Sequence, residues 1–275
     1  FFFFLMIRPP PRSTLDRSAA ASDVYKRQAL LIEETKKSYE DIRIQRSKNN
    51  LEKEYVPLEE ARKNKFKTDW KSFLPRVPKF TGNKILKDIS IEEVIPYIDW
   101  TPFFSSWQLK GKYPDIFNDS YVGEEAKELY AHALEMLDVI KNEKRLGLCA
   151  VFGIFPAKSV GDDVKISLDD SGESNTMVHF LRQQRKKSDG LPYYCLADFI
   201  CPEEEKKEDF LGMFAVTAGI GIEKWITFYE DQHDDYSSIM MKALADRLAE
   251  ALAEYLHEKV RMEYWGYSNQ KLEKQ

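Results

Sequence analysis

The C-terminal part of the sequence carries a row of polar side chains at helical spacing. Asp246, Glu250, Glu254 and His257 follow one another at steps of four, four and three residues, so an α-helix places them on one face. Apolar residues recur at helical spacing through positions 239–256 and form another face. The acidic row is therefore either a solvated helix surface or a set of carboxylates that faces a ligand cleft or a partner domain.

A second cluster places one carboxylate among aromatic rings. Asp99 lies within the run Tyr97–Phe104, and Trp107 follows one turn later. Burial of a carboxylate is costly unless the charge is paired, so we expect Asp99 to meet either a buried arginine or a cationic ligand. An aromatic wall beside a carboxylate suits a sulfonium or ammonium cation.

His233 and the two aspartates that follow it suggest a metal site or a hydrolytic site. Adjacent ligands rarely point at one ion, however, and Asp234 or Asp235 is needed to cap the next helix. The sequence has no Gly-x-Ser-x-Gly motif, and no cysteine stands beside a histidine. We therefore predict no metal ligand and no catalytic nucleophile in this chain.

Composition narrows the class of protein. The chain has 41 basic and 46 acidic residues, a net charge of −5, which argues against a general nucleic-acid binder. No apolar run approaches the roughly 20 residues needed to span a bilayer, so no membrane association is expected. Three cysteines without a Cys-x-x-Cys pair predict free thiols in a cytoplasmic protein.

The elements that must position these residues mix helices and strands. Without β-α-β alternation or a glycine-rich phosphate loop, the pattern predicts an α+β fold. Ser90 and Glu93 have the spacing of a capping box at a helix start. The expected helices begin at residues 57 and 90 and cover residues 124–144, 176–187 and 234–264; the expected strands cover residues 148–154, 164–167 and 210–217.

A series of short segments follows in order over about 170 residues: 97–104, 111–114, 153–157, 160–163, 181–184, 194–199, 214–217, 232–236, 242–250 and 264–267. Taken together, these segments resemble the C-terminal activation domain of the cobalamin-dependent methionine synthase family. The resemblance implies a single C-shaped domain with a central, mainly antiparallel sheet and flanking helices, including a long C-terminal helix.

The resemblance also implies a function. In that family of methyltransferases, the domain binds S-adenosylmethionine for reductive methylation of inactive cob(II)alamin back to methylcobalamin, with an electron from flavodoxin or a related reductase. It implies that Asp99 and Glu250 contact S-adenosylmethionine. It further implies that Asp246 and Glu223 face the cobalamin-binding domain of the same polypeptide.

The same resemblance divides the chain. Residues 1–28 lack periodicity and resemble translated sequencing-adapter DNA, so we expect an artefactual or disordered leader. Residues 29–68 match the connector from the preceding cobalamin-binding domain, and residues 69–275 match the activation domain. We expect truncation at both ends, because the family places an Arg-Pro-x-x-Gly-Tyr anchor downstream and the cobalamin and zinc sites upstream. The chain alone is therefore expected to be inactive.

Two functions of different kinds remain open. The chain is either the reactivation module of an enzyme or a non-catalytic docking module. The docking module would recognise a cobalamin domain or a flavodoxin-type reductase without binding a small molecule. A free-standing hydrolase built on His233 and Asp234 is the least favoured interpretation.

Overall fold

The computed structural model describes residues 32–33, 35–47, 54–169, 174–188 and 190–268. The expected leader at residues 1–28 lies outside this part of the chain. The chain divides into two compact units, one of residues 1–63 with 184–191 and one of residues 64–183 with 192–275. In the first unit, residues 35–47 form an exposed helix and α2 (Leu58–Lys63) is a short second helix.

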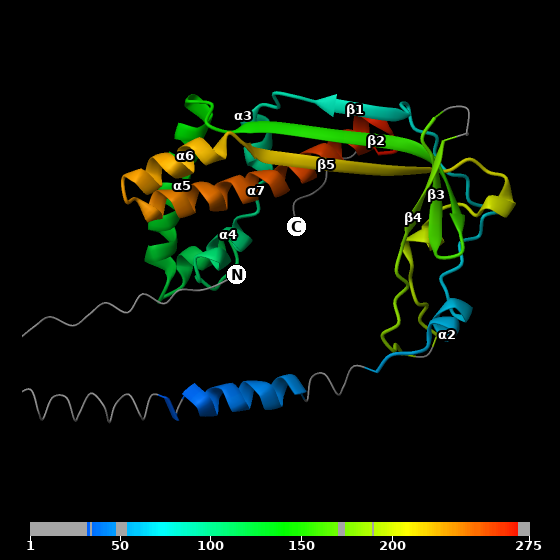
Figure 1. The fold of residues 1–275 in the computed structure, drawn as a ribbon, viewed down its shortest axis with the longest axis horizontal. Helices are drawn as coiled ribbons and strands as arrows, with labels where there is room; N and C mark the ends of the chain where they lie inside the picture. The colour runs from blue at the N-terminus through cyan, green and yellow to red at the C-terminus, as the bar shows by residue number, and fades with distance from the viewer. Residues whose placement is uncertain (1–31, 34, 48–53, 170–173, 189, 269–275) are drawn as a thin grey trace, which may run out of the picture. The chain divides into compact units, whose positions relative to one another are not determined.

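The second unit is built on an antiparallel sheet with one long strand, β2 (Gly147–Val160). The N-terminal part of β2 pairs with β1 (Gly82–Leu86) on one side and with β5 (Phe210–Ile220) on the other. Its last residues pair instead with β3 (Asp163–Ser167), which in turn pairs with β4 (Asn175–His179). Figure 1 shows β2 extending from between β1 and β5 into the β3–β4 pair.

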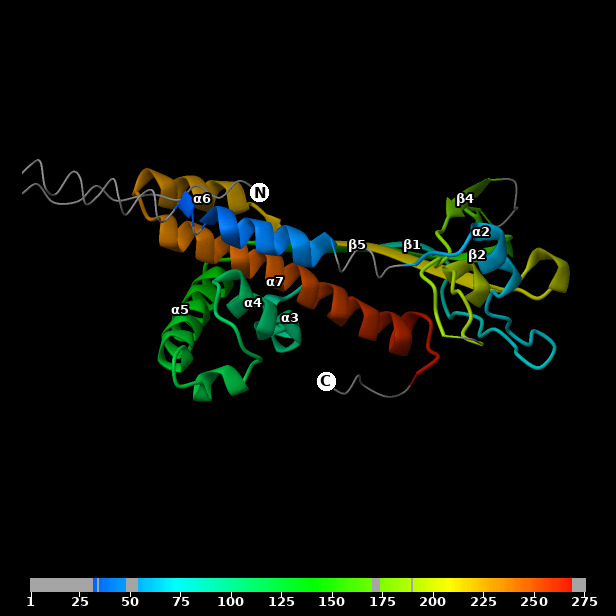
Figure 2. The same ribbon diagram turned by 90° about the horizontal axis from the view of Figure 1, so that it is seen from below.

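Helix α7 (Asp235–Lys259) lies along this sheet and is the centre of the core (Figure 2). Its leucines at positions 244, 248, 252 and 256 are fully buried. Toward one end of the helix they pack with the helices between β1 and β2, and Leu256 packs on Ala150, Phe152 and Ile154 of β2. Those helices are α3 (Ile91–Val94), α4 (Trp100–Ser106) and α5 (Gly123–Asn142).

Short elements complete the second unit. They are the 3-10 helices η1 (Ile95–Tyr97), η2 (Asp115–Asn118), η3 (Leu196–Phe199) and η4 (Glu203–Glu205), helix α6 (Ile222–Asp231) and the π-helical turn η5 (Val260–Tyr264).

The predicted α+β class, the antiparallel sheet and the long C-terminal helix are confirmed. The helix predicted at residues 176–187 is wrong, because Asn175–His179 hydrogen-bonds to β3 as strand β4. The strand predicted to end at Ile154 continues through Pro156 to Val160. Pro156 has no N–H to donate, but the backbone N–H of the next residue, Ala157, donates to the Asp209 carbonyl at 2.7 Å. A helix does follow Ser90, but the Ser90 hydroxyl contacts Glu92 and makes no capping hydrogen bond.

A buried ion-pair network fastens the β3–β4 end of the unit. The Arg182 side chain is 0% exposed and donates to Asp162 Oδ1 at 2.7 Å and to both carboxylate oxygens of Asp198 at 2.7 and 2.8 Å. It also donates to the Tyr193 carbonyl at 2.6 Å. Hydrogen bonds to Asp198 and Asp162 raise the pKa of Arg182 above its ordinary value despite its burial. One guanidinium thus joins the β2–β3 turn, the chain after β4 and η3.

Replacement of Arg182 by methionine should destabilise the fold strongly, because it leaves the buried Asp198 carboxylate without its cationic partner. The expected loss is about 3–5 kcal/mol in the free energy of unfolding, measured by urea denaturation. The control is Lys127→Met, which removes an exposed pair with Glu124 and should cost about 0–1 kcal/mol. Equal losses in the two variants would show that the Arg182 network does not hold this region together.

Candidate functional site

Asp99 caps a helix at the surface of the second unit. Its carboxylate Oδ1 accepts a hydrogen bond from the Thr101 backbone N–H at 2.9 Å, at the start of α4. Aspartate suits this position because its side chain satisfies an N–H that has no partner within the helix. Asp99 is exposed, and no arginine pairs with it in the described residues. Of the two expected partners, the buried arginine is therefore not found.

The aromatic residues of α4 and of the segments that follow it pack against one another. Trp100 meets Tyr130 edge to face, with ring centroids 4.8 Å apart, and Phe104 and Tyr113 stack at 6.4 Å. The Tyr113 and Tyr130 hydroxyls lie 3.4 Å apart. Burial, with the Tyr113 hydrogen bond, raises the pKa of Tyr130 to about 12. The rings fill the space against one another and fix the start of α4.

Glu250 and Asp246 share one cation on α7, Arg247. Arg247 Nη1 and Nη2 donate to the two Glu250 oxygens at 2.8 and 2.9 Å, and Nη2 also donates to Asp246 Oδ2 at 2.6 Å. The carboxylates are 64% and 69% exposed, whereas Arg247 is 9% exposed. Burial opposes the charge of Arg247, but the hydrogen bonds to the two acids outweigh it and raise the pKa of the guanidinium.

Sequence reasoning missed Arg247, although its spacing gave a signal. It stands next to Asp246 and three residues before Glu250, which is a favourable separation for an ion pair on a helix.

Glu223 lies in the first turn of α6 and is exposed. Gly221 precedes the helix with φ 89°, a backbone conformation that favours glycine. Arg145 holds α6 in place, because its guanidinium lies 3.8 Å from the centre of the Trp225 ring and donates to the Tyr229 hydroxyl at 2.6 Å. A negative side chain in a first helical turn is also favoured by the helix dipole.

Two of the four predicted acids, Asp246 and Glu250, lie on α7, and the other two lie on or beside elements that contact it. The elements η1 and α4, which flank Asp99, both contact α7, and so does α6. The buried residues Ile98 and Trp100 on either side of Asp99 belong to the same core cluster as Leu248 of α7. A common cleft for Asp99 and Glu250 stays a prediction, which the binding experiment below tests.

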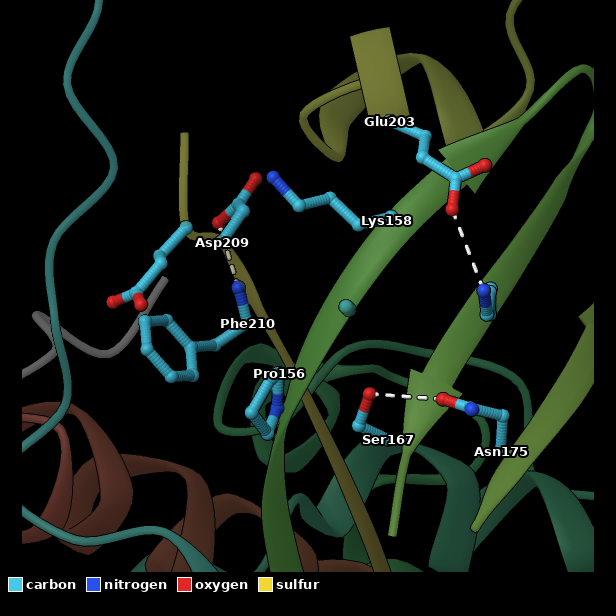
Figure 3. Close-up of a pocket in the computed structure, with 10 residues that line it drawn as sticks. Pro156, Lys158, Ser167, Asn175, Glu203, Asp209 and Phe210 are labelled. Carbon is cyan, nitrogen blue, oxygen red and sulfur yellow. Dashed lines mark hydrogen bonds and ion pairs between the residues drawn. The ribbon is translucent and has the colours of Figure 1, made fainter. Parts of the chain in front are cut away.

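Two cavities in the second unit are lined by residues other than the four predicted acids. One of about 320 Å³ is lined by β2, β3 and the residues before β5. Figure 3 shows the Lys158 side chain extending toward Asp209 there, with Ser167 and Asn175 hydrogen-bonded at 3.0 Å. Burial raises the pKa of Asp209. The other cavity, of about 440 Å³, is lined by Ser90, Glu93, Tyr255 and neighbouring residues, and none of the four predicted acids lines either one.

The sequence around His233 serves the fold. The Asp234 side chain accepts from the Ser237 backbone N–H at 2.9 Å and caps α7, as one of the two expected caps. His233 occupies the left-handed turn before the helix, with φ 56°. Within the described ranges, no group of three or more His, Cys, Asp or Glu side chains has the arrangement of a metal site.

A search of the described residues finds no helix with the length and apolar character of a membrane span.

Comparison with known proteins shows similarity to one family and to solved structures. The family model for "Vitamin B12 dependent methionine synthase, activation domain" matches residues 90–275. A crystal structure of the MetH reactivation domain bound to AdoHcy (S-adenosylhomocysteine) is 49% identical, with a TM-score of 0.74, and the match covers 79% of this chain and 67% of that one. These findings confirm the resemblance inferred from the sequence segments.

The capping role of Asp99 predicts a graded response to substitution. Asp99→Ala should lower the free energy of unfolding by about 0.5–2 kcal/mol, because the Thr101 N–H loses its acceptor. Asp99→Asn should stay within about 0.5 kcal/mol, because asparagine caps helices as well as aspartate does. Urea denaturation of both variants measures the difference. If alanine and asparagine are equally stable at this position, the cap does not support α4.

Proposed function

The chain belongs to the activation-domain family of vitamin B12-dependent methionine synthase, and we propose that it binds S-adenosylmethionine through Asp99 and Glu250. The related domain, 49% identical, was crystallised with AdoHcy, the form of that ligand without the transferable methyl group. This relative supports a reactivation module with its own small-molecule site over a docking module without one.

The assignment of Asp99 and Glu250 as ligand-binding residues rests on the exposure and the orientation of their two carboxylates. Both are exposed, and both are held in a fixed orientation, Asp99 by the Thr101 N–H and Glu250 by Arg247. Exposed side chains are usually free to rotate, so fixed ones lose less freedom when a ligand arrives. Fixed carboxylates at a helix start and on a neighbouring helix suit recognition of a small cationic ligand.

The chemistry of the acids fits S-adenosylmethionine. The ligand carries a sulfonium and an ammonium, which the exposed carboxylate of Asp99 can attract. It also carries ribose hydroxyls, which donate hydrogen bonds. Glu250 can accept them because an ionised carboxylate has about four acceptor positions, and Arg247 occupies only two of these.

The role of this chain in the reaction is to position the methyl donor. When cobalamin is bound in its own domain, its reduced cobalt supplies the nucleophile for the sulfonium methyl group. This chain therefore needs no nucleophile, and it must hold the methyl donor with the methyl group outward. Exposed acids on helix surfaces suit that task better than an enclosed cavity does, and orientation lowers the barrier without a catalytic side chain. On this basis the chain alone turns over no substrate.

Asp246 and Glu223 fit the role of docking residues for the cobalamin-binding domain. Asp246 is 69% exposed although Arg247 contacts it, and Glu223 stands exposed at the start of α6. Exposed acids attract a cation on the partner and speed its approach. Flavodoxin or a related reductase would supply the electron.

The ligand assignment predicts a specific effect of Asp99→Asn. This variant keeps the cap but removes the charge, so it should bind S-adenosylmethionine about 10- to 100-fold more weakly, from the loss of one charge-assisted hydrogen bond. Isothermal titration of the original chain and the variant measures the change. Glu250→Gln should weaken binding less, because Glu250 is assigned to the neutral ribose hydroxyls, for which glutamine keeps one acceptor oxygen.

The matched control is Asp119→Asn. Asp119 is also an exposed aspartate before a helix, and it accepts from the Tyr121 and Val122 N–H groups at 2.8 and 3.1 Å. Its variant should leave the affinity unchanged. If Asp99→Asn binds as well as Asp119→Asn, Asp99 is only a helix cap and the ligand lies elsewhere.

A further inference from the structure

We infer that Arg247 is a positioning residue that couples the two proposed roles of α7, ligand binding at Glu250 and domain docking at Asp246. The inference rests on the proposed function and deepens it, because it gives one residue control over both acids. It concerns a side chain that the sequence patterns did not single out.

The geometry makes Arg247 the only cation that contacts both acids in the described part of the chain. Its Nη2 atom is shared, at 2.6 Å from Asp246 Oδ2 and 2.9 Å from Glu250 Oε1, while Nη1 is committed to Glu250 Oε2 at 2.8 Å. The side chain is 10% exposed, so the guanidinium cannot turn away into water as an exposed arginine can. The pairing of both acids therefore depends on one buried group.

The bidentate contact fixes the plane of the Glu250 carboxylate. Two parallel N–H···O bonds set both the distance and the orientation of a carboxylate. The remaining acceptor positions of Glu250 then point in a set direction before any ligand arrives. Without Arg247, Glu250 and Asp246 would repel each other at a separation of four residues on the helix, and both side chains would rotate in solvent.

Because Asp246 and Glu250 share Arg247 Nη2, docking at Asp246 should strengthen ligand binding at Glu250. A cation from a docking partner that pairs with Asp246 competes with Arg247 for that carboxylate. Arg247 is then left to Glu250 alone and holds it more firmly, so docking and ligand binding favour each other. Because coupling between two sites is reciprocal, bound ligand should favour docking to the same degree.

Nitrogen-15 NMR of the arginine side chains tests the positioning without any ligand. In the free chain, rotation of the Arg247 guanidinium should be slow compared with that of Arg43, whose side chain is 79% exposed. Glu250→Gln should speed that rotation, because it disrupts the bidentate contact with Arg247. If Arg247 already rotates as fast as Arg43, the side chain positions neither acid, and the inference is overturned.

A double-mutant cycle with S-adenosylhomocysteine tests the coupling by titration. We expect Arg247→Met to weaken binding about 5-fold and Glu250→Gln about 10-fold, with the double variant no weaker than Glu250→Gln alone. A merely structural arginine would instead give additive effects, about 50-fold in total, and that result would overturn the inference. Arg247→Lys, which keeps the charge without the fork, should behave like Arg247→Met and replaces it in the cycle if the methionine variant unfolds.

Substitution of Asp246 tests whether loss of its contact with Arg247 strengthens ligand binding. Asp246→Asn mimics a neutralised Asp246 and should tighten binding about 2- to 3-fold in the original chain but change nothing in the Arg247→Met background. S-adenosylhomocysteine lacks the sulfonium charge, so loss of the Asp246 charge removes little direct attraction. Weaker binding of Asp246→Asn, or the same change in both backgrounds, would overturn the coupling.

A control variant and the binding of the unsubstituted chain separate failure of this inference from failure of the proposed function. Lys127→Met removes an ion pair of the same spacing on α5 and should leave ligand binding unchanged. If the unsubstituted chain binds no S-adenosylhomocysteine, the proposed function fails, and this inference fails with it. Ligand binding with additive effects overturns the inference alone.

Discussion

The buried stripe of α7 is the constraint on which the rest of the unit depends. Leu244, Leu248, Leu252 and Leu256 are fully buried, and they contact both the helical part of the core and the sheet. Because a helix with one face buried must turn its opposite face to solvent, Asp246 and Glu250 are exposed. The apolar stripe therefore determines where the acids can act, and Arg247 at the border of the stripe determines how they are held.

The sequence predicted the elements whose periodicity is long and regular. The amphipathic α5, the long α7 and the alternating β3 are as expected because each repeats its pattern over enough residues. Prediction was wrong at residues 176–187, where Thr176 and Met177 pair with β3. Those strand residues are mostly exposed, so they lack the apolar alternation that reveals a strand, and only pairing partners distant in sequence decide their conformation.

The surroundings of the candidate acids were predictable from the sequence only in part. The aromatic setting of Asp99 drew attention to a buried charge, whereas the carboxylate is exposed and the neighbouring rings of Trp100 and Phe104 are buried. The Asp99-x-Thr101-Pro102 pattern is itself typical of a helix start, so the cap could have been read from sequence. The shared contacts of Arg247 could not, because which of two neighbouring acids an arginine meets depends on side-chain rotamers and burial.

The pairing of strand β2 determines which amide hydrogens of the second unit exchange most slowly with solvent. Its residues from Ala150 to Ile154 are paired on both sides, with β1 and with β5, while its end carries the β3–β4 pair. Amide hydrogens in such a doubly paired segment exchange with solvent water only when the surrounding structure opens. The middle of β2 is therefore where the slowest amide exchange is expected.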